Sequence, residues 1–348
     1  MPHNILITGA SGYLGGTLLA RWHNADLKGY NNLFALVRTD AQAEAVKQYG
    51  AKPLTFSPYD ETAVADAIEA NNITIVYFLI DVLRSDSQVS IIKALGELKK
   101  KTGQEVHFLH TSGAKIFSSH AGAPNDRPLL DIDPDLFAIH KAQQSQHPEM
   151  LAAVKTDCTV VERGELHEVK TYVFYPCIVY GKGEGFGNPI SIQTVAIVKA
   201  AKAAGQVYKV TEGPANWPVC HVLDNASLYL TLLRAILNGE NPDHGKHGFY
   251  LASSGSVAWD DLYAAMAKAL TKHGVIESDT VSSADDSALE KMAAALDCSK
   301  PFVEVQVGGN CTFTAVHGEQ LGWKPEFPPE HAIEAAQAEV DLILKHLG

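Results

Sequence analysis

The chain has few cysteines and no long hydrophobic run. Its five cysteines among 348 residues are odd in number and widely spaced, without a Cys-x-x-Cys pair. This pattern is typical of reduced thiols rather than disulfides or a metal centre. The longest apolar stretch, residues 73–80, is far shorter than the ~20 residues of a membrane-spanning helix. No signal peptide precedes the first apolar segment at residue 4, so we expect a cytoplasmic protein.

The sequence also lacks a positive charge balance and compact metal-binding patterns. It carries 28 basic and 40 acidic residues, a net charge of −12. An acidic surface repels phosphate backbones and anionic lipid, which argues against nucleic-acid and membrane partners. The 15 histidines form no His-x-x-x-His pattern, and no Gly-x-Ser-x-Gly segment occurs. We therefore expect no metal and no serine-hydrolase chemistry.

What the first half does contain is a regular alternation of short apolar runs and amphipathic segments. Strict strand–helix alternation is typical of a parallel sheet with both faces covered by helices. The sequence thus predicts an α/β fold, a doubly wound parallel sheet of the Rossmann type. The expected strands are 5–8, 33–37, 53–56, 73–80, 106–110 and 172–175, and the expected helices are 13–23, 41–49, 61–70, 86–101 and one that begins near Pro134.

A glycine-rich turn, Thr8-Gly9-Ala10-Ser11-Gly12-Tyr13-Leu14-Gly15, directly follows the first expected strand. In such a turn the first glycine permits a tight bend, the second admits a pyrophosphate, and the third brings the helix close to the strand. The helix N-terminus then offers free N–H groups to the phosphates. The turn predicts a dinucleotide site with contacts from Gly9, Ser11, Gly12, Tyr13, Leu14 and Gly15.

The residue at the end of the second expected strand distinguishes between two cofactors. Enzymes that use NAD usually place an acidic side chain there, for the ribose hydroxyls. Here the strand ends in Arg38, and a guanidinium is suited to a 2′-phosphate. The sequence favours NADP(H), with NAD(H) as the alternative.

A change of composition marks the expected domain boundary. Four glycines and Pro189 fall within residues 181–189, after which the alternation weakens. We expect a dinucleotide-binding domain at residues 1–180, to which the chain returns around 219–255, and a smaller α/β lobe for the substrate within 181–348. The acid-rich run 126–135 predicts a solvated loop.

These segments together resemble the extended short-chain dehydrogenase/reductase family, the epimerase/dehydratase group. The glycine turn is similar to the family's signature. Residues Tyr175 to Gly181 are similar to its Arg-Pro-x-x-Val-Tyr-Gly segment, with tyrosine in place of arginine, and residues His221 to Asp224 are similar to its His-Val-x-Asp segment. The resemblance implies a helix-paired homodimer and further cofactor contacts from Leu79, Tyr175, Pro176 and Ile178.

The resemblance also implies a catalytic Tyr-x-x-x-Lys pair and a hydroxyl after the fifth strand. Lys141 fits the lysine, which would hold the nicotinamide ribose, but Phe137 stands four residues earlier in the tyrosine position. Phenylalanine keeps the ring and loses the transferable proton. Gly113 occupies the usual hydroxyl position, so Thr111 or Ser112 would bind the substrate oxygen.

Three explanations of Phe137 remain open. Phe137 is a substitution introduced into an ordinary enzyme, or it is natural and the catalytic proton comes instead from His140, Tyr175 or Ser112. It can also mark a protein that binds the dinucleotide without catalysis. The leading hypothesis is an NADP(H)-dependent oxidoreductase that acts on a carbonyl or alcohol of a small organic molecule. The alternatives are a sugar epimerase or dehydratase with bound NAD(P), and a non-catalytic NADP(H) sensor.

Overall fold

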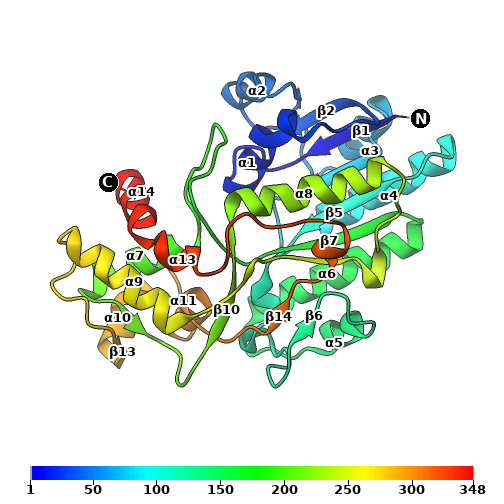
Figure 1. The fold of residues 1–348 in the computed structure, drawn as a ribbon. Helices are drawn as coiled ribbons and strands as arrows, with labels where there is room; N and C mark the ends of the chain where they lie inside the picture. The colour runs from blue at the N-terminus through cyan, green and yellow to red at the C-terminus, as the bar shows by residue number, and fades with distance from the viewer. Residues whose placement is uncertain (1, 348) are drawn as a thin grey trace.

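The computed structural model describes residues 2–347, and its largest element is a sheet of seven parallel strands (Figure 1). The strand order is β11-β7-β5-β4-β1-β2-β3, so the chain starts at the centre and winds outward in both directions. This confirms the predicted Rossmann-type fold. The strands are β1 (His3–Ile7), β2 (Tyr30–Leu36), β3 (Lys52–Leu54), β4 (Ile75–Phe78), β5 (His107–Thr111), β7 (Lys170–Pro176) and β11 (Phe249–Ala252).

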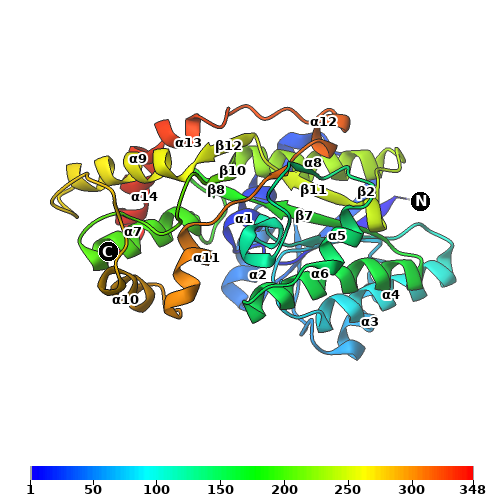
Figure 2. The same ribbon diagram turned by 90° about the horizontal axis from the view of Figure 1, so that it is seen from below.

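Both faces of this sheet are buried because neighbouring residues of each strand point to opposite sides. In β1, Ile5 and Ile7 belong to the core under α1 (Tyr13–Arg21) and α8 (Val222–Leu237), whereas Leu6 belongs to the core on the other face. The second core includes side chains from α3 (Glu61–Ala70) and α4 (Asp86–Thr102), beside which α6 (Pro148–His167) lies (Figure 2). Because helices cover both faces of the sheet, its strands are apolar along their whole length.

The expected helix from Pro134 is divided into two helices. The first, α5 (Leu136–Ala142), ends because Gln143 has extended backbone angles, with φ −58° and ψ 140°. The Gln143 side chain donates to the carbonyl oxygen of Ile116 at 2.8 Å, which holds the break in place. The long helix α6 starts only at Pro148, and proline suits this first position because its missing N–H would have no partner within the helix.

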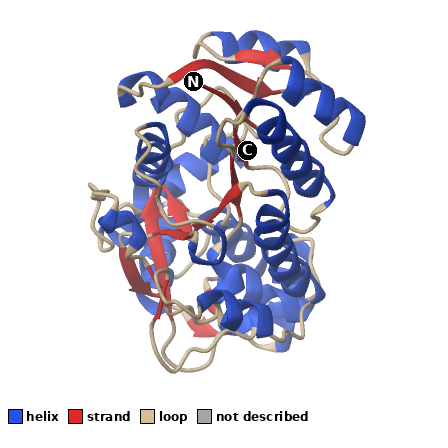
Figure 3. Ribbon diagram, turned by 90° about the vertical axis from the view of Figure 1, so that its right-hand side faces the viewer, coloured by secondary structure: helices blue, strands red, loops and turns tan. Residues whose placement is uncertain are grey.

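A smaller lobe adjoins the carboxyl ends of the large sheet (Figures 1 and 3). Its three-stranded sheet has the order β12-β10-β8. The chain passes from this sheet through α8 back to β11 of the large sheet and then out again. The strands and main helices of the lobe are β8 (Ile178–Tyr180), β10 (Asn216–His221), β12 (Gly255–Ala258), α7 (Gln193–Ala204), α9 (Trp259–Lys272), α10 (Asp286–Ala295), α11 (Val303–Val307) and α14 (Ala336–Leu347).

Late in the sequence the chain crosses from the small lobe to the large one. The strand β14 (Phe313–Thr314) pairs with β6 (Leu129–Leu130). Beside this pair Asp131, only 1% exposed, accepts hydrogen bonds from the backbone N–H groups of Leu251, Val316 and His317. The expectation of a solvated acidic loop is wrong at this residue, because its carboxylate is buried and binds two segments that are distant in sequence.

Within residues 2–347 no helix combines the length and apolar character needed to cross a membrane. The same residues offer no group of three or more His, Cys, Asp or Glu side chains arranged to hold a metal ion.

Candidate dinucleotide and substrate site

The glycine turn between β1 and α1 is a backbone cradle that only glycine allows. Gly9 has a φ of +70°, and its carbonyl oxygen accepts from the N–H of Gly12 at 2.9 Å. A Cβ atom on Gly15 would lie 2.3 Å from the same carbonyl oxygen. The first residue of α1 is Tyr13, and Gly12 before it has no side chain to cap the helix. The first N–H groups of α1 are thus available to a ligand.

A segment from the start of the small lobe packs against this turn. We call residues 181–189 the strap. A Cβ on Gly185 would lie 2.4 Å from the Cα of Gly16, and one on Gly187 would lie 2.0 Å from the carbonyl oxygen of Ser11. The N–H of Asn188 donates to this oxygen at 3.0 Å. The glycines that suggested a domain boundary therefore serve close packing between the lobes.

The end of β2 is connected to the turn through Gln42. Its side-chain oxygen accepts from the N–H of Arg38 at 2.9 Å, and its amide nitrogen donates to the Ser11 hydroxyl at 3.3 Å. Arg38 itself is exposed. Among residues 2–347 none forms an ion pair with its guanidinium, which leaves the group available for an anion beside the turn.

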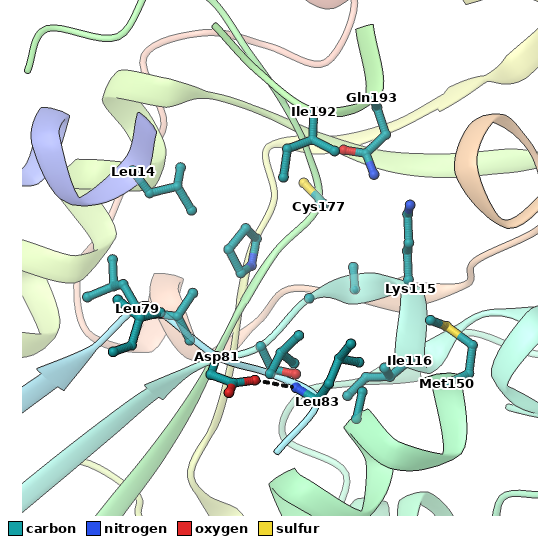
Figure 4. Close-up of a pocket in the computed structure, with 18 of the residues that line it drawn as sticks. Leu14, Leu79, Asp81, Leu83, Lys115, Ile116, Met150, Cys177, Ile192 and Gln193 are labelled. Atoms are coloured by element: carbon teal, nitrogen blue, oxygen red, sulfur yellow. Dashed lines mark hydrogen bonds between the residues drawn. The ribbon is translucent and has the colours of Figure 1, made fainter. Parts of the chain in front are cut away.

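A cavity of about 370 Å³ lies at the carboxyl edge of the large sheet, between the lobes. At one side it is lined by Leu14 and Leu79, next to the glycine turn, and we call this the nucleotide end (Figure 4). The opposite side is lined by Lys115, Ile116, Met150 and Gln193 (Figure 4). We call these residues, together with the lining residue Trp217, the substrate end. A dinucleotide that starts at the turn would extend into the cavity with its nicotinamide.

Several of the predicted site residues meet in this cavity. Leu14, Leu79, Thr111, Ser112 and Pro176 all line it. The Thr111 hydroxyl is engaged, 2.7 Å from the hydroxyl of Tyr229. The Ser112 hydroxyl is buried, with no hydrogen-bond partner among the described residues. Ser112 is therefore the better-placed of the two hydroxyls for a substrate oxygen.

Phe137 and Lys141 lie outside the cavity lining, on α5. The Lys141 ammonium is 2.6 Å from a carboxylate oxygen of Glu162, and its side chain is 59% exposed. The Phe137 ring packs against Phe249, with 6.5 Å between ring centroids. The structure does not bring this pair to Ser112, because the break after α5 separates it from the helix that lines the cavity.

That lining helix is α6. Its residues at the cavity are Met150 and Ala153, neither of which can donate a proton. The part of α6 that lines the cavity therefore offers an apolar surface, without a phenol or an amine.

His140 and Tyr175, two proposed substitutes for the phenol, belong to a buried polar network around Asp157. The Tyr175 hydroxyl donates to the Asp157 carboxylate at 2.8 Å, and the Nε2 atoms of His110 and His140 lie 3.3 and 3.6 Å from it. Burial disfavours the charged carboxylate, but the two neighbouring imidazoles outweigh this and lower the pKa of Asp157 to about 2. Ile178, which the resemblance to the family suggested as a further cofactor contact, is buried in β8. His140, Tyr175 and Ile178 do not line the cavity.

The sequence analysis missed the polar lining residues Asp81, Gln193 and Lys115, the last of which is cationic. Lys115 lies on the short 3₁₀ helix η2 (Ala114–Phe117), directly after β5. Its ammonium donates to the side-chain oxygen of Gln306 at 3.3 Å. Burial lowers the pKa of Lys115 to about 8. The sequence feature that could have identified Lys115 is its position two residues after Gly113, at the carboxyl end of an expected strand.

The strand order and the glycine turn define a Rossmann-type α/β protein. A profile of the NAD dependent epimerase/dehydratase family matches residues 5–246, and the chain belongs to this family.

Comparisons with individual proteins agree with this assignment. An uncharacterized protein of Saccharomyces cerevisiae is 24% identical over 241 residues, which are 68% of this chain and 72% of the yeast protein. The crystal structure of UDP-glucose 4-epimerase with UDP-glucose from Thermotoga maritima has a TM-score of 0.63 at 15% identity, over 98% of this chain and 99% of that one. L-threonine dehydrogenase from Phytophthora infestans has a TM-score of 0.60 at 12% identity, over 97% and 99%. At these identities the structural likeness describes the fold.

Proposed function

We propose that this protein is an NADP(H)-dependent oxidoreductase that acts on a carbonyl or alcohol group of a small organic molecule. The observation that carries the proposal is the juxtaposition of the glycine cradle with a largely apolar cavity lined by Ser112, whose hydroxyl has no hydrogen-bond partner among the described residues. The name of the family to which the chain belongs, NAD dependent epimerase/dehydratase, supports a nicotinamide cofactor.

The residues present fit such a cofactor. The N–H groups at the start of α1 would hold the pyrophosphate, and glycine at positions 9 and 15 leaves the backbone close enough for this. Arg38 would pair with the 2′-phosphate that distinguishes NADP(H) from NAD(H). When bound, the nicotinamide supplies the group that gives or accepts a hydride.

The protein's own contribution at the reacting atoms is to position, to exclude water and to stabilise charge. Ser112 would donate a hydrogen bond to the substrate oxygen, on which negative charge develops as hydride moves to a carbonyl carbon. Met150, Ile116 and Trp217 form apolar walls, and such walls strengthen that hydrogen bond by lowering the local dielectric.

A non-catalytic NADP(H) sensor is the second candidate, favoured by the aliphatic residues Met150 and Ala153 on the lining helix. Fluorescence titration of the purified chain with NADPH, followed by absorbance assays over a panel of aldehydes, ketones, oxo acids and alcohols, separates the candidates. We expect NADPH to bind and at least one compound to change the reduced-nicotinamide absorbance. Binding without turnover across the panel supports the sensor. A folded protein that binds neither NADPH nor NADH overturns both.

A further inference from the structure

Lys115 is a cation inside a mostly apolar cavity, and no acidic side chain offsets its charge. Among residues 2–347 no carboxylate oxygen lies within 4.0 Å of its ammonium, whereas most of the other lysine side chains with described contacts reach an acid. Its hydrogen-bond partner is the neutral Gln306 amide. Figure 4 shows the side chain extending from η2 into the cavity, with its nitrogen toward Gln193. A buried charge without a counter-charge costs free energy, unless a bound ligand supplies the opposite charge.

The other titratable groups around Lys115 do not supply that charge. Cys298 and His120 are its ionisable neighbours on the adjoining elements, and a thiol and an imidazole provide no fixed negative charge at neutral pH. The Cys177 thiol also lines the cavity, and burial raises its pKa, so it stays neutral. Asp81 stands at the nucleotide side, where its carboxylate already accepts hydrogen bonds from Leu83, Arg84 and Tyr59.

We propose that Lys115 binds a carboxylate of the substrate, so that the substrate end of the cavity recognises small oxo or hydroxy acids with an apolar body. The ammonium and the Gln193 amide would hold the carboxylate. Met150, Ile116 and Trp217 would contact the apolar body. The unpartnered Ser112 hydroxyl, three residues before Lys115, would take the carbonyl or hydroxyl oxygen. The assignment of that last oxygen rests on the proposed function, whereas carboxylate binding by Lys115 does not.

The binding test uses a matched pair of probes, 4-methyl-2-oxopentanoate and its neutral amide, titrated calorimetrically into the full chain with and without NADP⁺. A hydrogen bond to a buried charge changes affinity by roughly 10- to 100-fold. We expect the acid to bind at least about tenfold more tightly than the amide, and K115Q to remove this preference while leaving amide binding within about twofold. K115R retains part of the preference. K155Q, which changes an exposed lysine of the lining helix, leaves it intact.

A second readout follows the amine itself. Trace acetylation across pH 6–10, read by mass spectrometry, reports the pKa of Lys115 against exposed lysines of the same sample. A carboxylate partner favours the ammonium form, so saturating 4-methyl-2-oxopentanoate raises the pKa of Lys115 above about 8. By linkage, affinity for the acid falls as pH rises above 8, by up to about tenfold per unit, and affinity for the amide does not.

These experiments distinguish failure of the Lys115 proposal from failure of the proposed function. Equal affinity for acid and amide, an acid preference that survives in K115Q, or no binding of the acid at millimolar concentration overturns the proposal. Loss of NADPH binding with carboxylate binding retained overturns only the proposed function. Parallel loss of amide binding in both K115Q and K115R indicates a structural role for Lys115 and also overturns the proposal.

Discussion

The two ends of the cavity are built from different parts of the polypeptide. The nucleotide end is formed chiefly by backbone groups from one uninterrupted segment, residues 8–15, at the junction of β1 and α1. The substrate end is formed by side chains from separate segments, among them Lys115, Met150, Gln193 and Trp217. Every residue but proline has the same backbone N–H, so a backbone site needs only a permissive shape, whereas a side-chain site depends on which distant residues meet.

The largest expected effect comes from adding one methyl group at the nucleotide end. In Gly15→Ala the new Cβ would lie 2.3 Å from the Gly9 carbonyl oxygen, so α1 must move away from β1. We expect affinity for NADPH to fall at least about 100-fold, and stability by about 1–3 kcal/mol, the usual cost of overpacking. Fluorescence titration and urea unfolding measure the two effects.

Gly113→Ala serves as the stability control for this change. Gly113 has extended backbone angles, and a Cβ there meets no atom within 4 Å. Its unfolding free energy should stay within about 1 kcal/mol of wild type. Unchanged NADPH affinity in Gly15→Ala would contradict the assignment of the turn.

An intermediate effect is expected from the buried network below the substrate end. Asp157→Asn removes the charge that His110, His140 and Tyr175 surround, and His140 connects through Gln143 to the backbone of Ile116. Weakening the hydrogen bonds of buried polar groups usually costs about 1–3 kcal/mol. Urea unfolding at pH 7 should show this loss, while NADPH affinity stays within about twofold.

The same network gives stability a definite pH dependence. The pKa of Asp157 is about 2 in the folded chain, below the ~3.9 of an unfolded aspartate. Its contribution is therefore complete above about pH 4 and is lost as pH falls toward 2. The unfolding midpoint of wild type should fall more steeply between about pH 4 and pH 2 than that of Asp157→Asn. Tyr175→Phe, which keeps the carboxylate, should retain the steep dependence; equal slopes in wild type and Asp157→Asn would contradict this account.

The smallest effect is expected at the exposed edge of the nucleotide end. Arg38→Ala removes one charge-assisted contact to a 2′-phosphate, so the ratio of NADPH to NADH affinity should fall about tenfold. NADH affinity itself should change little. Arg127→Ala, at another exposed arginine that pairs with Asp133, provides the control. If the ratio of NADPH affinity to NADH affinity is unchanged in Arg38→Ala, the result would favour NAD(H) as the cofactor.

The sequence predicted the parts of the molecule that depend on local pattern. The apolar runs matched β1, β2, β4, β5 and β7 closely, because strands covered on both faces must be apolar throughout. The pairing of Phe137 with Lys141 rested on the resemblance to the family and on the spacing of one helical turn. Gln143 and Pro148 end one helix and start the next, and this local break left the pair on α5, away from the lining helix.

Taken alone, the sequence determined the alternating sheet and the glycine cradle, since strand periodicity and a tight turn are properties of neighbouring residues. The tertiary structure decided which helix lines the cavity, why Asp131 is buried, and how the strap reaches the turn. It also decided that Lys115 lies without an acidic partner in an apolar space. Burial and counter-charge depend on residues far apart in sequence, and only the folded chain brings these together.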